Sequence, residues 1–205
     1  MKIHHMTTGA LPVWLAIPAA SPVRFHLHLH GSGERGSDVG NLSKWGLTRL
    51  IAEGLELPFA VVVPVCPADS DWKEPQQIAA AEQCLTAIMD EAGHRGRAAS
   101  ISGYSMGVRG VWNSLNRHSG LYDRVLVVAS RAPSSPPKPV DPGLSLRIFH
   151  GSDDDHEPVA KVRSFCATAA KLGWNLRFEE LPAAGHFIAE DVFRRTDIQQ
   201  WLAGF

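Results

Sequence analysis

Short apolar runs alternate with amphipathic helical patterns along most of this chain. The clearest run, Ala60–Val65, is nearly continuous in apolar residues and rich in valine, as expected for a strand buried on both faces. The clearest helical pattern is Pro75–Ala92, where Pro75 suits a first turn and apolar residues recur on one face. This alternation predicts an α/β fold with a single, mostly parallel sheet flanked by helices.

The remaining expected elements follow the same alternation. Strands are expected at Val13–Ile17 and Val23–Leu29, paired as a hairpin across a proline-rich turn, and at Ala99–Ser102, Val125–Ala129, Leu146–His150 and Leu176–Leu181. Helices are expected at Lys44–Glu53, Met106–Arg117, Pro158–Leu172 and Asp191–Leu202. The proline-rich stretch 132–143 is expected to form a surface loop, so residues 1–205 are interpreted as one domain.

Charge and composition exclude several classes of function. The chain has 20 Lys and Arg against 21 Asp and Glu, so it lacks the basic surplus of a nucleic-acid-binding protein. No apolar run reaches about 18 residues, which argues against a membrane span. The segment after Lys2 lacks the apolar centre of a secretory signal, so a cytoplasmic location is expected. Three widely spaced cysteines are expected to be buried free thiols: Cys66, Cys84 and Cys166.

A candidate nucleophile lies in the segment Gly103-Tyr104-Ser105-Met106-Gly107, between a predicted strand and a predicted helix. A sharp turn there would place Ser105 in a strained backbone conformation, and its glycine neighbours would let strand and helix approach closely. Its Oγ would then be exposed at the carboxyl edge of the sheet, where the helix N-terminus favours developing negative charge. The pattern therefore predicts that Ser105 acts as a nucleophile.

A second glycine-rich segment, His30-Gly31-Ser32-Gly33, directly follows another predicted strand. Ligands of open α/β sheets bind at such carboxyl ends, and backbone N–H groups there can stabilise an oxyanion. We expect the N–H group of Ser32 to form the oxyanion hole together with that of Met106, with Gly33 as the adjacent alternative to Ser32.

A serine hydroxyl needs a nearby base, and the sequence places a suitable histidine near the end of the chain. His186 lies in a loop of small residues between the last predicted strand and the last predicted helix. A carboxylate that orients the imidazole should lie between the serine and the histidine in sequence. Asp153, Asp154 and Asp155 follow one another after a strand, and the spacing alone leaves all three open.

Other polar and aromatic residues have weaker signals. His26, His28 and His30 alternate along one predicted strand, a pattern that could bind a metal but is better explained by packing in the sheet. No metal site is therefore expected. Three residues near strand ends are candidates for lining a substrate pocket: Tyr104, Trp72 and Arg131.

Four motifs in order resemble the α/β-hydrolase superfamily, most closely its small phospholipase/carboxylesterase and predicted-peptidase type. They are His30–Asp38 as the oxyanion segment, Val63–Pro67 followed by Trp72, Gly103–Trp112 around the serine, and His150-Gly151-x-x-Asp154 with Pro158-Val159. The resemblance spans residues 13–202 and selects Asp154 as the acid. The chain departs from it at Val108, where a further glycine is common.

The resemblance implies hydrolysis of carboxylic esters by a Ser105–His186–Asp154 triad through an acyl-enzyme, without a metal or organic cofactor. The short chain has no obvious insertion for a large lid, so small, soluble, short-chain esters are the expected substrates. A peptidase or amidase with the same triad and a catalytically silent binding protein are the alternatives. A dienelactone-type hydrolase would need a cysteine at position 105. A homodimer is compatible with the sequence.

Overall fold

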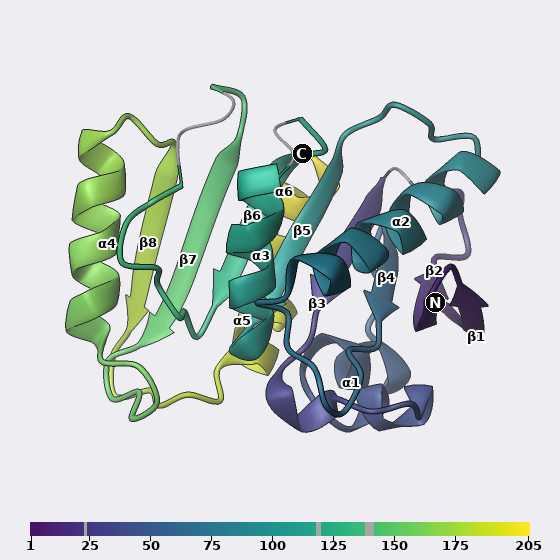
Figure 1. Ribbon diagram of the computed structural model, residues 1–205, viewed down its shortest axis with the longest axis horizontal. Helices are drawn as coiled ribbons and strands as arrows, with labels where there is room; N and C mark the ends of the chain where they lie inside the picture. The colour runs from purple at the N-terminus through teal and green to yellow at the C-terminus, as the bar shows by residue number, and fades with distance from the viewer. Residues whose placement is uncertain (23, 118–119, 138–141) are drawn as a thin grey trace.

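The computed structural model describes residues 1–22, 24–117, 120–137 and 142–205, and its centre is an eight-stranded sheet (Figure 1). The strand order is β1-β2-β4-β3-β5-β6-β7-β8. Pairing is antiparallel between β1 and β2 and between β2 and β4, and parallel across the rest. The strands are β1 (Lys2–Thr8), β2 (Leu11–Ile17), β3 (Phe25–Leu29), β4 (Ala60–Pro64), β5 (Ala99–Tyr104), β6 (Tyr122–Val128), β7 (Ser145–Gly151) and β8 (Leu176–Leu181).

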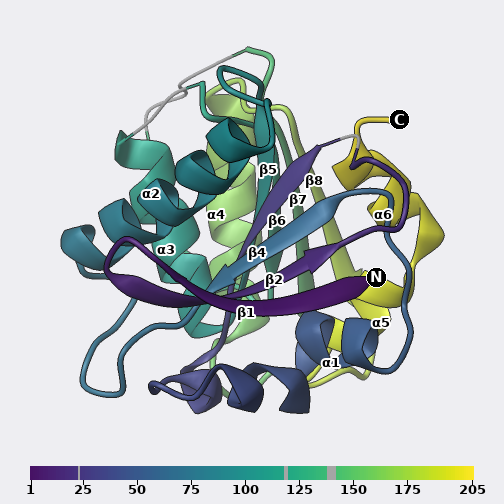
Figure 2. The ribbon, with the colours of Figure 1, turned by 90° about the vertical axis from the view of Figure 1, so that its right-hand side faces the viewer.

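Helices cover both faces of the sheet and form the outer layers of a three-layer arrangement (Figure 2). One face packs against α2 (Pro75–Glu91), α3 (Met106–Arg117) and α4 (Val159–Lys171), and the other against α1 (Gly46–Ala52), α5 (Ala189–Arg194) and α6 (Thr196–Ala203). Alternate residues of β4 supply both cores: Val62 packs into the first, and Val61 and Val63 into the second. The mostly parallel α/β architecture is therefore confirmed.

The expected hairpin between the strands near residues 13–17 and 23–29 is wrong. β4 lies between β2 and β3, and β2 instead forms a hairpin with β1, a strand that the sequence analysis missed. Residues Lys2–Thr8 alternate between exposed and half-buried positions at the edge of the sheet. Backbone hydrogen bonds to β2 hold this strand in place. Because it does not depend on a buried apolar face, its sequence contains no apolar run that would predict it.

The single helix expected at Asp191–Leu202 is also wrong, because the chain forms two helices there. Arg195 separates α5 from α6 with an extended backbone (φ −71°, ψ 122°). Its guanidinium pairs with Glu179 of β8 and with Asp197 at 3.0 Å, and these contacts fix the break. The expected loop at 132–143 lies partly outside the described residues, as does Val23 of the expected second strand.

The parallel strands β3, β5, β6, β7 and β8 all end at the lower edge of the sheet in Figure 1. The loops that follow them therefore meet at this edge, although they are far apart in sequence. The three cysteines are buried and free, as expected. Among the described residues, no helix combines the length and the apolar character needed to cross a membrane.

Candidate active site

Ser105 lies at the turn between β5 and α3 and adopts a left-handed backbone conformation with φ of 52°. The glycines on either side of it are required by close packing. A Cβ at Gly103 would lie 2.6 Å from the carbonyl of Gly107, and a Cβ at Gly107 would lie 1.8 Å from the carbonyl oxygen of Leu29. The predicted strand–turn–helix geometry around Ser105 is therefore confirmed.

His186 connects Ser105 with Asp154 through its two ring nitrogens. Its Nε2 lies 2.8 Å from Ser105 Oγ, and its Nδ1 lies 2.8 Å from Asp154 Oδ2. All three side chains are buried. Asp153 and Asp155 are exposed, and neither contacts the imidazole. The tertiary structure thus brings together Ser105, His186 and the aspartate that the resemblance selects.

The surroundings of this set favour a neutral imidazole beside an ionised carboxylate. Burial lowers the pKa of His186 below its ordinary value of 6.5, while the charge and hydrogen bond of Asp154 oppose this effect. Burial opposes ionisation of Asp154, but hydrogen bonds from His186 and from the backbone N–H groups of residues 156 and 157 hold its pKa below 3.8. A neutral His186 can accept a proton, and the carboxylate fixes the ring tautomer.

The loop that carries His186 packs directly on the loop that carries Asp154. A Cβ at Gly151 would lie 2.2 Å from the carbonyl oxygen of Ala184, so only glycine permits this approach. Asp153 N–H donates to the same carbonyl oxygen at 2.9 Å. The hydroxyl of Tyr104 donates to the carbonyl oxygen of His186 at 3.4 Å. These contacts set the relative position of Asp154 and His186.

The segment after β3 presents free backbone donors beside Ser105. A short 3-10 turn, η1 (Ser32–Glu34), begins here, and Gly31 N–H donates to Glu34 Oε2 at 2.8 Å. Among the described residues, none accepts a hydrogen bond from the N–H group of Ser32, Gly33 or Met106. The Met106 N–H belongs to the first turn of α3, where helices leave donors unpaired.

A cavity of about 680 Å³ opens beside Ser105 and His186. Of the expected pocket residues, Tyr104 and Arg131 line it, as do Ser32 and Gly33. Trp72 does not. It is fully buried in the core, and its Nε1 donates to the carbonyl oxygen of His30 at 3.1 Å. The expectation for Trp72 is therefore wrong, because its large apolar ring packs among the core residues on the α2 and α3 side of the sheet.

Several lining residues were not found by the sequence analysis. His156 stacks on His186 with ring centroids 4.1 Å apart. Phe187 and Trp45 also line the cavity, and they are 80% and 53% exposed. Phe187 directly follows His186 in the sequence, and this adjacency could have predicted that it lines the cavity. Trp45 precedes a helix on a distant segment and had no signal.

Glu34 is the most unusual of the lining residues that were missed, because it is a carboxyl group that is only 5% exposed. Burial raises its pKa to about 8, although the hydrogen bond from Gly31 acts in the opposite direction. Glu34 therefore carries a proton at neutral pH for most of the time. The spacing of Gly31 and Glu34, three residues apart before a helical turn, was a usable signal.

The row of histidines along and just after β3 packs in or near the sheet, as expected. His26 bonds to Ser100 at 2.8 Å and to Ser102 at 2.7 Å, and His28 bonds to the same Ser102 at 2.7 Å. His30 accepts a hydrogen bond from Cys66 N–H at 2.9 Å. Burial lowers the pKa of His28 to about 3 and that of His30 to about 4, so both rings are neutral.

Comparison with known proteins gives matches in structure only. No family model matches the chain, and no curated protein matches its sequence. A thermostable esterase matches with a TM-score of 0.78 and 20% identity over 98% of this chain and 62% of that chain. This chain thus spans less than two thirds of that esterase. A serine hydrolase without a lid from Xanthomonas campestris matches with a TM-score of 0.68 and 16% identity over 98% and 92% of the two chains.

A third match is an acylaminoacyl peptidase from Pyrococcus horikoshii, with a TM-score of 0.66 and 11% identity over 98% of this chain and 40% of that one. The strand order, the turn at Ser105 and these matches agree on one architecture. This chain has the α/β-hydrolase fold.

Proposed function

We propose that this chain is a serine hydrolase that cleaves carboxylic esters through an acyl-enzyme. The observation that carries the proposal is the pair of 2.8 Å hydrogen bonds by which His186 joins Ser105 to Asp154 beside an open cavity. A nucleophile, a base and a group that orients the base are the parts that acyl transfer requires. The fold matches, which include esterases, support the same reading.

In the first step Ser105 Oγ attacks the ester carbonyl carbon while its proton passes to His186 Nε2. The carbonyl π electrons move to oxygen, and the N–H groups of Ser32 and Met106 donate hydrogen bonds to the oxyanion, with Gly33 as the alternative to Ser32. Asp154 stabilises the imidazolium through the Nδ1 hydrogen bond. Collapse of the intermediate breaks the bond to the alcohol oxygen, which takes the proton from His186.

The second step releases the acid by the same groups in reverse. A water molecule gives a proton to His186 Nε2 and attacks the acyl carbon, and the oxyanion again forms at the same N–H donors. Collapse returns the proton from His186 to Ser105 Oγ and frees the carboxylic acid. No redox change occurs, and the reaction needs only ester and water.

The shape of the cavity supports small, soluble esters as substrates. Its volume of about 680 Å³ suits small molecules, and the exposed rings of Trp45 and Phe187 offer apolar surface along its wall. We place Tyr104 in the machinery as a residue that positions His186 through the loop carbonyl. A cytoplasmic location and a homodimer stay predictions from the sequence.

Hydrolysis of p-nitrophenyl acetate by the wild type, Ser105→Ala and Ser37→Ala tests the proposal. Ser37 is an exposed serine outside the cavity lining, so it is the matched control. We expect Ser105→Ala to lose at least about 10⁴-fold in kcat, since the nucleophile is removed, and Ser37→Ala to keep the wild-type rate. A fluorophosphonate should label the wild type and the control, with loss of fluoride, but not Ser105→Ala.

Equal rates in Ser105→Ala and the wild type would reject Ser105 as the nucleophile. Absence of both turnover and labelling in the wild type would favour a binding protein that keeps the fold.

A peptidase or amidase is the second candidate, favoured by the structural match to an acylaminoacyl peptidase. The same residues would cleave an amide if the cavity accommodated the amine leaving group and His186 protonated it. A p-nitrophenyl ester and a p-nitroanilide with the same acyl group separate the two activities. We expect kcat/KM to be far higher for the ester, and comparable values would move the assignment to the amidase.

A further inference from the structure

The cavity beside Ser105 has two arginines on its wall, and their surroundings differ. Arg49 donates to Glu53 at 2.8 Å and to Glu190 at 3.3 Å, so its charge is already balanced. Arg131 has no ion-pair partner among the residues that the structure describes. It is half-buried, and a partly desolvated guanidinium without a carboxylate is costly to maintain.

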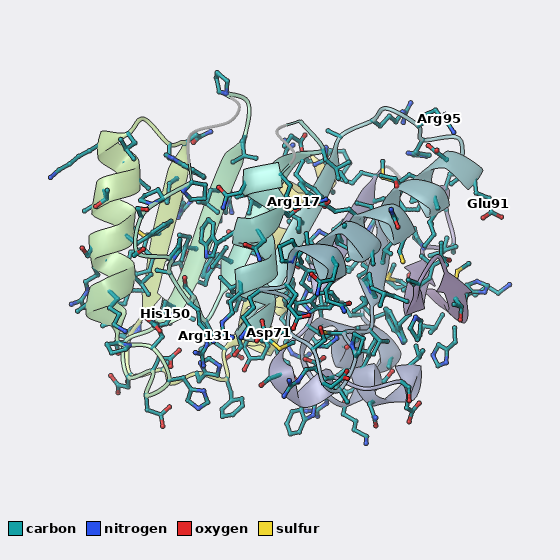
Figure 3. All side chains as sticks on the ribbon, viewed as in Figure 1. Asp71, Glu91, Arg95, Arg117, Arg131 and His150 are labelled. Carbon is teal, nitrogen blue, oxygen red and sulfur yellow. The ribbon has the colours of Figure 1, made fainter. Side chains whose placement is uncertain are left out.

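Arg131 is close enough to the reacting groups to influence them. The pKa of His186 is lowered chiefly by burial, and the positive charge of Arg131 acts in the same direction. Figure 3 shows Arg131 near His150, at the carboxyl end of the sheet where the site lies. A substrate held by Ser105 therefore lies within the field of this cation.

The backbone before Arg131 is firmly fixed. Ala129 turns the chain out of β6 with a left-handed φ of 52°, and its N–H donates to the carbonyl oxygen of Phe149. Ser130 N–H donates to His150 Nδ1 at 3.0 Å, and His150 Nε2 bonds to the carbonyl oxygen of Glu157 at 2.9 Å. The start of this loop is thus held against the loop of Asp154, so little conformational entropy is lost when a ligand binds there.

The acidic residues of the cavity do not balance Arg131. Glu190 is paired with Arg49, and Asp154 outside the lining is occupied by His186. Glu34 is buried, and its raised pKa of about 8 keeps it largely protonated at neutral pH. Asp191 is exposed, where solvent screens its charge. An incoming anion therefore meets an unpaired cation and little repulsion.

We propose that Arg131 binds a carboxylate carried by the ester substrate, so that this hydrolase prefers anionic esters to neutral ones. This inference rests on the proposed function, and it narrows the substrate class to esters with a free carboxylate on the acyl or the alcohol part. A guanidinium binds a carboxylate through two parallel hydrogen bonds, which lysine cannot reproduce.

Two matched pairs of esters test the preference. On the acyl side the pair is p-nitrophenyl hydrogen glutarate and p-nitrophenyl methyl glutarate, and on the alcohol side it is p-acetoxybenzoate and its methyl ester. The readout is the ratio of kcat/KM for the anionic ester to that for its neutral partner, which cancels general effects on catalysis. We expect this ratio to fall at least about tenfold in Arg131→Gln for one pair.

Arg131→Lys should keep part of the preference, since it retains the charge but not the planar fork. Arg49→Gln is the matched control, because it removes a paired arginine from the same cavity, and its ratio should stay within about threefold of the wild type. Raising the ionic strength should lower the wild-type ratio, a measurement that needs no variant.

Unchanged ratios in Arg131→Gln for both pairs, or an equal fall in Arg49→Gln, would overturn the assignment of Arg131 while leaving ester hydrolysis intact. A wild type that hydrolyses none of these esters would overturn the proposed function and this inference together.

Discussion

At the scale of single residues, His186 is the centre of the proposed chemistry. Each ring nitrogen has one partner. Because Nδ1–H donates its hydrogen bond to the Asp154 carboxylate, the nitrogen that faces Ser105 is the one without a proton. Burial lowers the pKa of His186, which favours the neutral ring. In the proposed reaction, His186 is the base, and its neighbours Ser105 and Asp154 come from two other loops.

The assignment of the acid can be tested against its two neighbours. We expect Asp154→Asn to lower kcat by about 10⁴-fold, because an amide would hold the imidazole in the wrong tautomer. Asp153→Asn and Asp155→Asn should stay within a few-fold of the wild type, since both side chains are exposed and neither contacts His186. Ester hydrolysis by the three variants is the measurement, and a larger loss at either neighbour would reject Asp154.

At the scale of elements, the site depends on loops that follow parallel strands. β5 leads to Ser105, β7 to Asp154 and β8 to His186, and the strands are ordered so that these loops meet at one edge. The loops of Asp154 and His186 are closely packed, because Gly151 lies against the carbonyl groups of Ala184 and Gly185. Small changes in this packing should therefore affect catalysis.

Gly151→Ala should separate the acid from the base. Its Cβ would lie 2.2 Å from the carbonyl oxygen of Ala184, so the loop of His186 must move. We expect kcat to fall about 100-fold and the free energy of unfolding to fall by about 1–3 kcal/mol. The control is Gly185→Ala in the same loop, whose nearest neighbour, Asp153 O, is 4.0 Å away. Ester hydrolysis gives kcat and urea denaturation gives the free energy of unfolding. Equal losses in Gly151→Ala and Gly185→Ala would contradict the role of Gly151.

At the scale of the whole molecule, neutral groups buried in and beside the sheet link stability to pH. Burial lowers the pKa of His28 to about 3, that of His30 to about 4, and that of His26 well below 6.5. The folded state therefore excludes protons that the unfolded chain binds. Their contribution to stability is present above pH 6.5 and is lost as the pH falls below it. Glu34, with its raised pKa of about 8, acts in the opposite direction between pH 8 and 4.5.

Three histidines outweigh one carboxyl, so we expect the free energy of unfolding to fall by roughly 3 kcal/mol between pH 7 and pH 5. Equilibrium urea denaturation across this range is the measurement. His28→Gln should weaken the pH dependence by about one proton, while His5→Gln, at an exposed position, should leave it unchanged. Stability that stays level or rises on acidification would contradict this account.

The sequence predicted those parts of the fold that have a local pattern. Met106–Arg117 and Leu176–Leu181 were placed with their observed bounds, because periodic apolar residues mark amphipathic helices and alternating strands. The edge strand Lys2–Thr8 was missed and the hairpin was wrong, because strand pairing is a contact between distant segments. The break at Arg195 depends on ion pairs with Glu179 and Asp197, and the first of these lies in another element.

The sequence by itself determined the turn that carries Ser105, since glycines on either side of a serine between a strand and a helix leave few alternatives. It also placed His186 and a group of three aspartates at the ends of strands. The resemblance also selected Asp154 among them, and Arg131 was expected at the pocket. Only the tertiary structure decided that Trp72 faces the core and that Arg131 has no ion-pair partner among the described residues. The physical reason is that side-chain direction and charge balance depend on neighbours that are distant in sequence.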